Sequence, residues 1–105
     1  MTHNFEQQAP YARHLARDRR LVMLRVLADS AGYQANEYIL ETMLEELGHV
    51  VGSDLLHGEL AWLAEQGLLT QQRVAAVLIA TLTRRGLDVA RGRAAVPGVA
   101  RPQPE

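Results

Sequence analysis

The histidines and carboxylates of this 105-residue chain lack the spacings that catalysis or metal binding requires. No cysteine is present, which excludes disulfides, thiolate nucleophiles and cysteine-ligated metal sites. The chain also lacks a Gly-x-Ser-x-Gly elbow and a phosphate-binding glycine loop. Its four histidines show no His-x-x-x-His spacing: His3, His14, His49 and His57. We therefore predict no enzymatic activity, no catalytic residue, no metal site and no cofactor.

Arginine supplies the remaining candidate chemistry, which is the binding of phosphate groups. All eleven basic residues are arginine, and the formal net charge of the chain is −1. The charges are segregated, because residues 36–66 contain seven acidic residues and no arginine. This acidic middle separates two basic ends, so the domain is expected to present surfaces of opposite charge.

The apolar periodicity predicts three helices that position these charges. The first is expected over residues 11–28, where one side of the helix is apolar and the other carries an arginine stripe. The second is expected from the N-cap Asn36 to Gly48, and the third from the N-cap Ser53 to Gly67. Polar and glycine residues interrupt the pattern between them.

A hairpin and a last helix are predicted next. Residues 68–70 and the β-branched run 74–82 are expected to form two strands joined at the polar residues 71–73, with Arg73 at the tip. Thr83 is expected to cap a final helix that ends near Gly92.

This order of elements predicts a mainly α domain with a small β-hairpin, the winged helix-turn-helix fold. Such a domain has a three-helix core, a two-stranded wing and a C-terminal helix. Residues 10–93 are expected to form it, with a flexible N-terminus over residues 1–9 and a disordered proline-rich tail over residues 94–105. One core is expected to contain Leu24, Leu44, Leu60, Trp62, Leu63 and Ile79.

The sequence favours a cytoplasmic location. The longest apolar stretch, residues 74–82, is too short to span a bilayer. Residues 1–10 lack the basic and apolar regions of a signal peptide.

Two segments, AWLAEQGLLT and VLIATLTRRGLDVA, resemble winged-helix bacterial regulators of the MarR and ArsR type. The matching residues are Leu63, Gly67, Leu68, Leu69, Leu82, Thr83 and Gly86. Over residues 12–102 the chain is more narrowly similar to small ArsR-like proteins encoded by Mu-like phages and prophages. That likeness depends on the segments DRRLVMLRVLADSAGY, AWLAEQGL, LTRRGLDVA and VPGV.RP. The resemblance implies a phage or prophage DNA-binding protein that regulates transcription in the cytoplasm of a bacterial host cell.

In such a fold the third helix enters the major groove, and arginines of the first helix and the wing contact phosphates. The exposed third-helix positions are expected to be Ser53, Asp54, His57, Gly58, Ala61 and Glu65. None has a side chain that makes most bidentate base contacts, and the acidic middle opposes phosphate binding. We therefore predict weak contacts, dominated by the DNA backbone, from Arg13, Arg17, Arg20, Ser53, His57, Arg73 and Arg84.

The acidic middle supports an alternative hypothesis, a winged-helix module for protein–protein interaction in phage assembly or host interference. A basic partner would dock on Asp54, Glu59 and Glu65. For the arginines, the alternative to phosphate binding is that they are solvated and paired with nearby acids such as Asp18, Glu45 and Asp88. A homodimer through the first and last helices is also expected, because Leu87, Val89 and Ala90 give the short last helix an apolar side.

Overall fold

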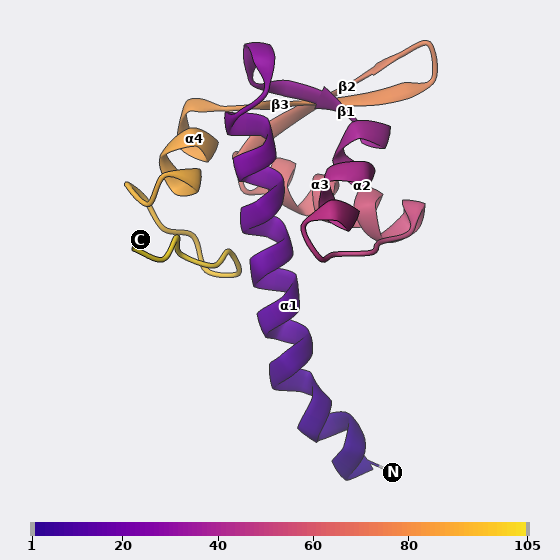
Figure 1. Ribbon diagram of the computed structural model, residues 1–105, viewed down its shortest axis with the longest axis vertical. Helices are drawn as coiled ribbons and strands as arrows, with labels where there is room; N and C mark the ends of the chain where they lie inside the picture. The colour runs from indigo at the N-terminus through magenta and orange to yellow at the C-terminus, as the bar shows by residue number, and fades with distance from the viewer. Residues whose placement is uncertain (1, 105) are drawn as a thin grey trace.

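The computed structural model describes the backbone of residues 2–104 and the side chains of residues 9–104. The elements in chain order are α1 (Thr2–Ala28), the 3₁₀ turn η1 (Ala31–Tyr33), β1 (Gln34–Asn36), α2 (Glu37–Glu46), α3 (Ser53–Glu65), β2 (Leu69–Val74), β3 (Val77–Leu82) and α4 (Arg84–Ala90). Figure 1 shows the sheet across one end of α1, with α2 and α3 on one side and α4 with the C-terminal segment on the other. Within the described residues this is an α+β domain with four α-helices and a three-stranded antiparallel sheet.

The sheet has the order β1-β3-β2, so the last strand in sequence lies in the middle. Its central strand buries alternate residues, Leu78, Ala80 and Leu82, against the helices. The sequence predicts Ile79 in the core, and that prediction is wrong because successive side chains of a strand point to opposite faces. Strand β1 is not predicted at all, since three residues are too few to show a periodic pattern.

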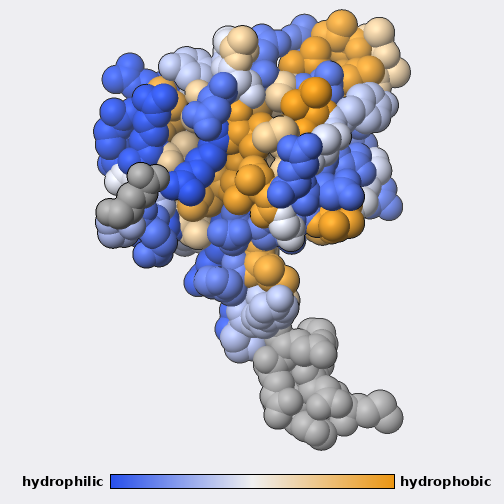
Figure 2. Space-filling view, viewed as in Figure 1, coloured by the Kyte–Doolittle hydropathy of each residue, from blue (hydrophilic) through white to orange (hydrophobic). Residues whose placement is uncertain are grey.

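The hairpin turns at Ala75 and Ala76 rather than at residues 71–73, which continue β2 and pair along β3. Arg73 therefore lies on the strand, two residues before the turn. The turn residues have φ of 50° and 66°, as both central residues of a type I′ turn require. The twist of the paired strands favours this turn even though alanine seldom adopts it. The hairpin extends away from the helices (Figure 1), and its tip is hydrophobic (Figure 2).

The core is built mainly from leucine, as the apolar stripes predict. Leu24, Leu44, Leu60 and Leu63 are completely enclosed. Burying one such side chain contributes about 1.5–3 kcal/mol, so these residues account for much of the driving force for folding. Trp62, which is also predicted in the core, is half-buried and packs against its edge.

Two of the three predicted N-caps are confirmed. The Asn36 side chain accepts two backbone N–H bonds at the start of α2, and the Thr83 hydroxyl accepts the N–H of Gly86 at the start of α4. Ser53 is instead the first residue of α3, and Gly52 occupies the cap position without a side-chain bond. The helix therefore starts one residue earlier than predicted.

Helix α1 begins at Thr2 instead of near Pro10, so the boundary expected between residues 9 and 10 does not mark the start of regular structure. Met1 lies outside the described residues. Proline lacks an N–H and removes one intrahelical hydrogen bond, yet the helix continues on both sides of Pro10. The first turns of α1 project beyond the rest of the domain (Figure 1). No α-helix in residues 2–104 combines the length and apolar character needed to cross a bilayer.

The C-terminal segment packs against α1, although its proline content predicts disorder. Residues 94–104 contain neither helix nor strand. Val96 and Val99 are nevertheless 5% and 7% exposed, and the N–H of Ala100 donates to the carbonyl oxygen of Arg17 at 3.1 Å. Composition does not reveal this order because two apolar anchors and a few hydrogen bonds hold an irregular chain.

Candidate nucleic-acid interface

An open cleft of about 320 Å³ lies between α3 and the hairpin. This α3–hairpin cleft is lined by His57, Gln71, Gln72, Arg73 and Leu78. The three side chains that β2 contributes to the cleft are exposed, and they combine two amides with a guanidinium group. The sequence predicts His57 and Arg73 as separate DNA contacts, and the structure brings them together in one place.

A buried carboxylate holds His57 in the cleft. Glu37 is 8% exposed, and one of its oxygens lies 2.9 Å from Nε2 of His57. Its other oxygen accepts the backbone N–H of Leu78 at 2.6 Å. The Leu78 N–H first, and then His57, hold the pKa of Glu37 below its ordinary value, because both bonds favour the ionised form. A ligand in the cleft would meet the Nδ1 side of the imidazole, since Nε2 faces Glu37.

Local structure explains why Glu37 lies there. It follows the N-cap Asn36 directly and occupies the first turn of α2, where a carboxylate is favourable. Asn36 pairs with Ile79 across β1 and β3, which places Glu37 beside the start of β3. The sequence analysis counts Glu37 only among the acids of the acidic middle. An acid directly after a predicted N-cap marks the first turn of the helix, but it does not indicate that the side chain binds His57 and the Leu78 N–H.

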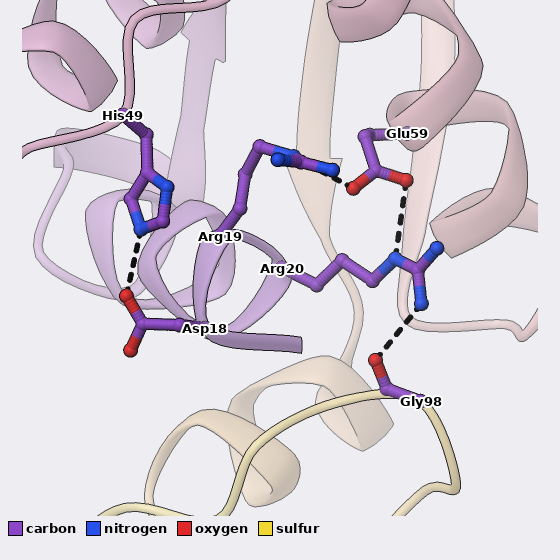
Figure 3. Close-up of polar contacts among 6 residues, drawn as sticks. All are labelled: Asp18, Arg19, Arg20, His49, Glu59 and Gly98. Carbon is purple, nitrogen blue, oxygen red and sulfur yellow. Dashed lines mark hydrogen bonds and ion pairs between the residues drawn. The ribbon is translucent and has the colours of Figure 1, made fainter. Parts of the chain in front are cut away.

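A second polar cluster lies between α1 and α3 and is enclosed (Figure 3). Glu59 is 5% exposed, and its two oxygens accept Nε–H bonds from Arg19 at 2.9 Å and Arg20 at 3.1 Å. Arg20 also donates to the carbonyl oxygen of Gly98 at 3.0 Å. Its guanidinium carbon lies 4.2 Å from the centre of the Trp62 ring, within cation–π range.

This cluster corrects two predictions. Arg20 is predicted to contact phosphate and Glu59 to contact a basic partner, but the two side chains bind each other inside the domain. Arg20 is the last residue of the arginine stripe of α1, and it is bound by α3 and by the C-terminal segment. Neither residue is presented to a partner.

The other predicted site residues are exposed but lie outside the cleft. On the basic side these are Arg13, Arg17 and Arg84. On the face of α3 they are Ser53, Asp54 and Glu65. The structure therefore assembles His57 and Arg73, and leaves the remaining candidates dispersed over the surface.

Two histidines, His49 and His57, each bind a carboxylate. Nε2 of His49 lies 2.6 Å from Oδ2 of Asp18, joining the α2–α3 loop to α1 (Figure 3). His57 is bound to Glu37 in the same manner. Within the part of the chain that the structure describes, no group of three or more histidine, aspartate or glutamate side chains is arranged to hold a metal ion.

Two curated proteins resemble this chain over most of its length. The chain is 50% identical over 90 residues to an uncharacterized protein, gp26, of Escherichia phage Mu, a match that covers 86% of this chain and 93% of the phage protein. It is 46% identical over 74 residues to an uncharacterized protein of Haemophilus influenzae, which covers 70% of this chain and 72% of that protein. No protein-family model matches the chain, and no solved structure matches it.

Proposed function

This chain belongs to the family of the phage Mu protein gp26, and on that premise we propose that it is a winged-helix protein that binds DNA and regulates transcription in the bacterial cytoplasm. Family membership supports the association with phage. Both relatives are uncharacterized, so the support for DNA binding comes from the residues of this chain. The proposal assigns no catalytic step to the protein.

The order of elements supports the winged-helix part of the proposal. Helices α2 and α3 are separated by a short turn, and the hairpin of β2 and β3 follows directly as the wing. Strand β1 closes the sheet on the other side of β3. In a helix-turn-helix the second helix of the pair enters the major groove, which assigns base contacts to α3.

The observation that carries the proposal is the shared cleft of His57 and Arg73. A guanidinium group binds phosphate with charge-assisted hydrogen bonds, and an amide pairs with two atoms of adenine. Gln71 and Gln72 supply the amides that the exposed face of α3 lacks. Glu37 orients the imidazole, so the cleft offers one phosphate contact beside several side chains suited to base edges.

Binding is expected to be weak and sensitive to salt. Asp54 and Glu65 are exposed on α3. Their negative charge repels the DNA phosphates and so opposes the favourable release of counterions that drives binding. Each phosphate that the protein neutralises changes the slope of log K against log salt by about −0.9. A shallow slope would accordingly indicate few phosphate contacts.

The direct test is a titration of mixed-sequence duplex DNA at low salt, repeated as the salt concentration rises. Arg73→Ala is expected to weaken binding to every sequence and to reduce the salt slope by about 1, whereas His57→Ala is expected to change the order of sequence preference. Arg91→Ala is the matched control, because Arg91 is exposed and lies outside the cleft. Absence of binding at low salt, or equal losses for the Arg73 and Arg91 variants, would contradict the proposal.

One observation favours a second candidate function, a module that binds a basic protein. Helix α3 contains no arginine or lysine, and Asp54 and Glu65 remain exposed near its two ends. Charge reversal by Asp54→Arg and Glu65→Arg would then disrupt a protein complex, since an acidic surface needs a basic complement. In that case Arg73→Ala would leave the complex intact, which separates the two functions.

A further inference from the structure

An apolar groove of about 510 Å³ runs between α1 and α2, away from the α3–hairpin cleft. The wall of this α1–α2 groove consists of Val22, Val26, Ile39, Met43 and Leu47. Its polar rim consists of Arg25, Asp29 and Ser30. Ile39 and Leu47 are 50% and 54% exposed, which is unusual for large aliphatic side chains grouped together. Figure 2 shows hydrophobic side chains over the part of α1 within the body, with hydrophilic side chains on either side.

The projecting part of α1 carries an apolar stripe on the same face of the helix. Tyr11 is 66% exposed and Leu15 is half-buried. At 3.6 residues per turn, positions 11, 15, 22 and 26 fall within about 60° of one another around the helix axis. The stripe therefore continues the α1 wall of the groove. Because Tyr11 is largely uncovered, burying it against a partner would stabilise this segment.

We propose that the groove receives the projecting part of α1 from a second copy of this chain. Stripe and groove share one face of one helix, so two antiparallel copies fill both grooves at once around a two-fold axis. Tyrosine suits this position because its ring is apolar and its hydroxyl reaches a polar partner. In the dimer the ring of Tyr11 lies against Val22 and Val26 of the other copy, and the hydroxyl meets the polar rim.

Charge also favours a second copy as the occupant. Residues 9–17 carry Arg13, His14 and Arg17 and no acid. Besides the buried Glu37, helix α2 carries three glutamates and no basic residue. Antiparallel docking brings the basic segment of each copy near the acidic α2 of the other, with Arg13 and Arg17 on the side of α1 away from the apolar contact, which is a complementary arrangement of overall charge.

The same geometry revises the dimer that the sequence predicts through the first and last helices. Val89 and Ala90 of α4 are 2% and 3% exposed, because α4 packs against α1 of its own chain. The apolar side of α4 is thus already covered. The groove on α2 offers the uncovered apolar surface, so the interface is formed by α1 and α2.

Sedimentation analysis tests the dimer directly, without DNA. The wild type is expected to approach twice the chain mass of 11.6 kDa at high concentration. Tyr11→Asp and Ile39→Asp are expected to return it to the monomer mass. Val50→Asp is the matched control, because Val50 is 81% exposed and lies outside the groove. Circular dichroism establishes that each variant is folded. A wild type that stays monomeric, or a control variant that dissociates equally, would overturn the proposal.

The lack of native cysteine permits a test of orientation. Tyr11 precedes Val22 by eleven residues, about 16 Å along the helix, so Tyr11 does not reach the groove of its own chain. A Tyr11→Cys/Met43→Cys double variant is expected to form a disulfide-linked dimer on mild oxidation, and neither single variant is expected to do so. A double variant that stays unlinked, or a linked dimer from Tyr11→Cys alone, would exclude the antiparallel arrangement.

Discussion

Two carboxylates of the acidic middle are buried in regions that differ in what surrounds them. Glu59 lies between α1 and α3, where Arg19 and Arg20 bind its two oxygens. The C-terminal segment accepts a further hydrogen bond from Arg20. Glu37 lies under the α3–hairpin cleft, where it binds a half-exposed histidine and a backbone N–H. The first carboxylate joins elements of the fold, and the second orients a side chain toward solvent. Burial alone therefore does not distinguish a structural carboxylate from one that serves a site.

Burial of these carboxylates also changes how strongly the acidic middle is expected to repel DNA. Seven acids in the acidic middle suggest strong repulsion of phosphate. One of them, Glu59 of α3, is neutralised inside the domain by Arg19 and Arg20, and another, Glu37 of α2, is buried against His57 and the Leu78 N–H. The exposed face of α3 is therefore less acidic than the count along the sequence implies.

The largest expected effect is the loss of stability in Glu59→Ala. The variant leaves two guanidinium groups, with side chains only 14% and 20% exposed, without their carboxylate. Arginine does not lose its charge, so the free energy of unfolding is expected to fall by about 3–5 kcal/mol, as for other broken buried ion pairs. Urea denaturation at neutral pH measures this change in the free energy of unfolding.

Glu37→Ala is the matched comparison for that experiment. It leaves a backbone N–H and a partly exposed histidine that can turn toward water, so the expected loss is smaller. Equal losses for the two variants would remove the distinction between the regions.

A smaller effect is expected for Arg20→Lys. Lysine keeps the charge, but it has no planar fork with which to bind Glu59 and Gly98 while stacking on Trp62. We expect a loss of about 1–2 kcal/mol, the sum of one hydrogen bond and one cation–π contact. The chain contains a single tryptophan, so its fluorescence reports this contact during unfolding. Arg17→Lys, on the exposed part of the same helix, should change stability by less than about 0.5 kcal/mol, and an equal loss there would refute the role of Arg20.

The parts of the fold that depend on local signals could be predicted from the sequence. The helices follow from apolar periodicity, and the caps at Asn36 and Thr83 follow from residue type. The turn at Ala75 and Ala76 could not be predicted, because strand pairing decides it against the preference of alanine. Strand β1 exists only because β3 offers it an edge.

The residues of the candidate site likewise divide into those with local signals in the sequence and those that depend on long-range packing. His57 and Arg73 could be named from the expected positions of a third helix and a hairpin. Glu37 and the pairing of Arg20 with Glu59 could not, because those contacts join residues up to 41 positions apart. Such pairs are set by how the elements pack, which residue spacing does not reveal. The charge of Arg20 is visible in the sequence, but its partner is not.

The smallest expected effect is a change in how stability depends on pH in Glu37→Gln. Glutamine keeps the shape of the side chain and accepts the Leu78 N–H, but it never carries the charge. The pKa of Glu37 lies below its ordinary value of 4.5 in the folded protein, mainly because of the Leu78 N–H and then His57. A lowered pKa means that the carboxylate adds stability above pH 4.5, and that this stability is lost as the pH falls through the folded-state pKa. The melting temperature of the wild type should therefore exceed that of the variant at pH 5 and approach it toward pH 3. A gap that stays constant over this range would show that the cleft does not favour the charged form, and Glu37 would then differ from Glu59 only in its degree of enclosure.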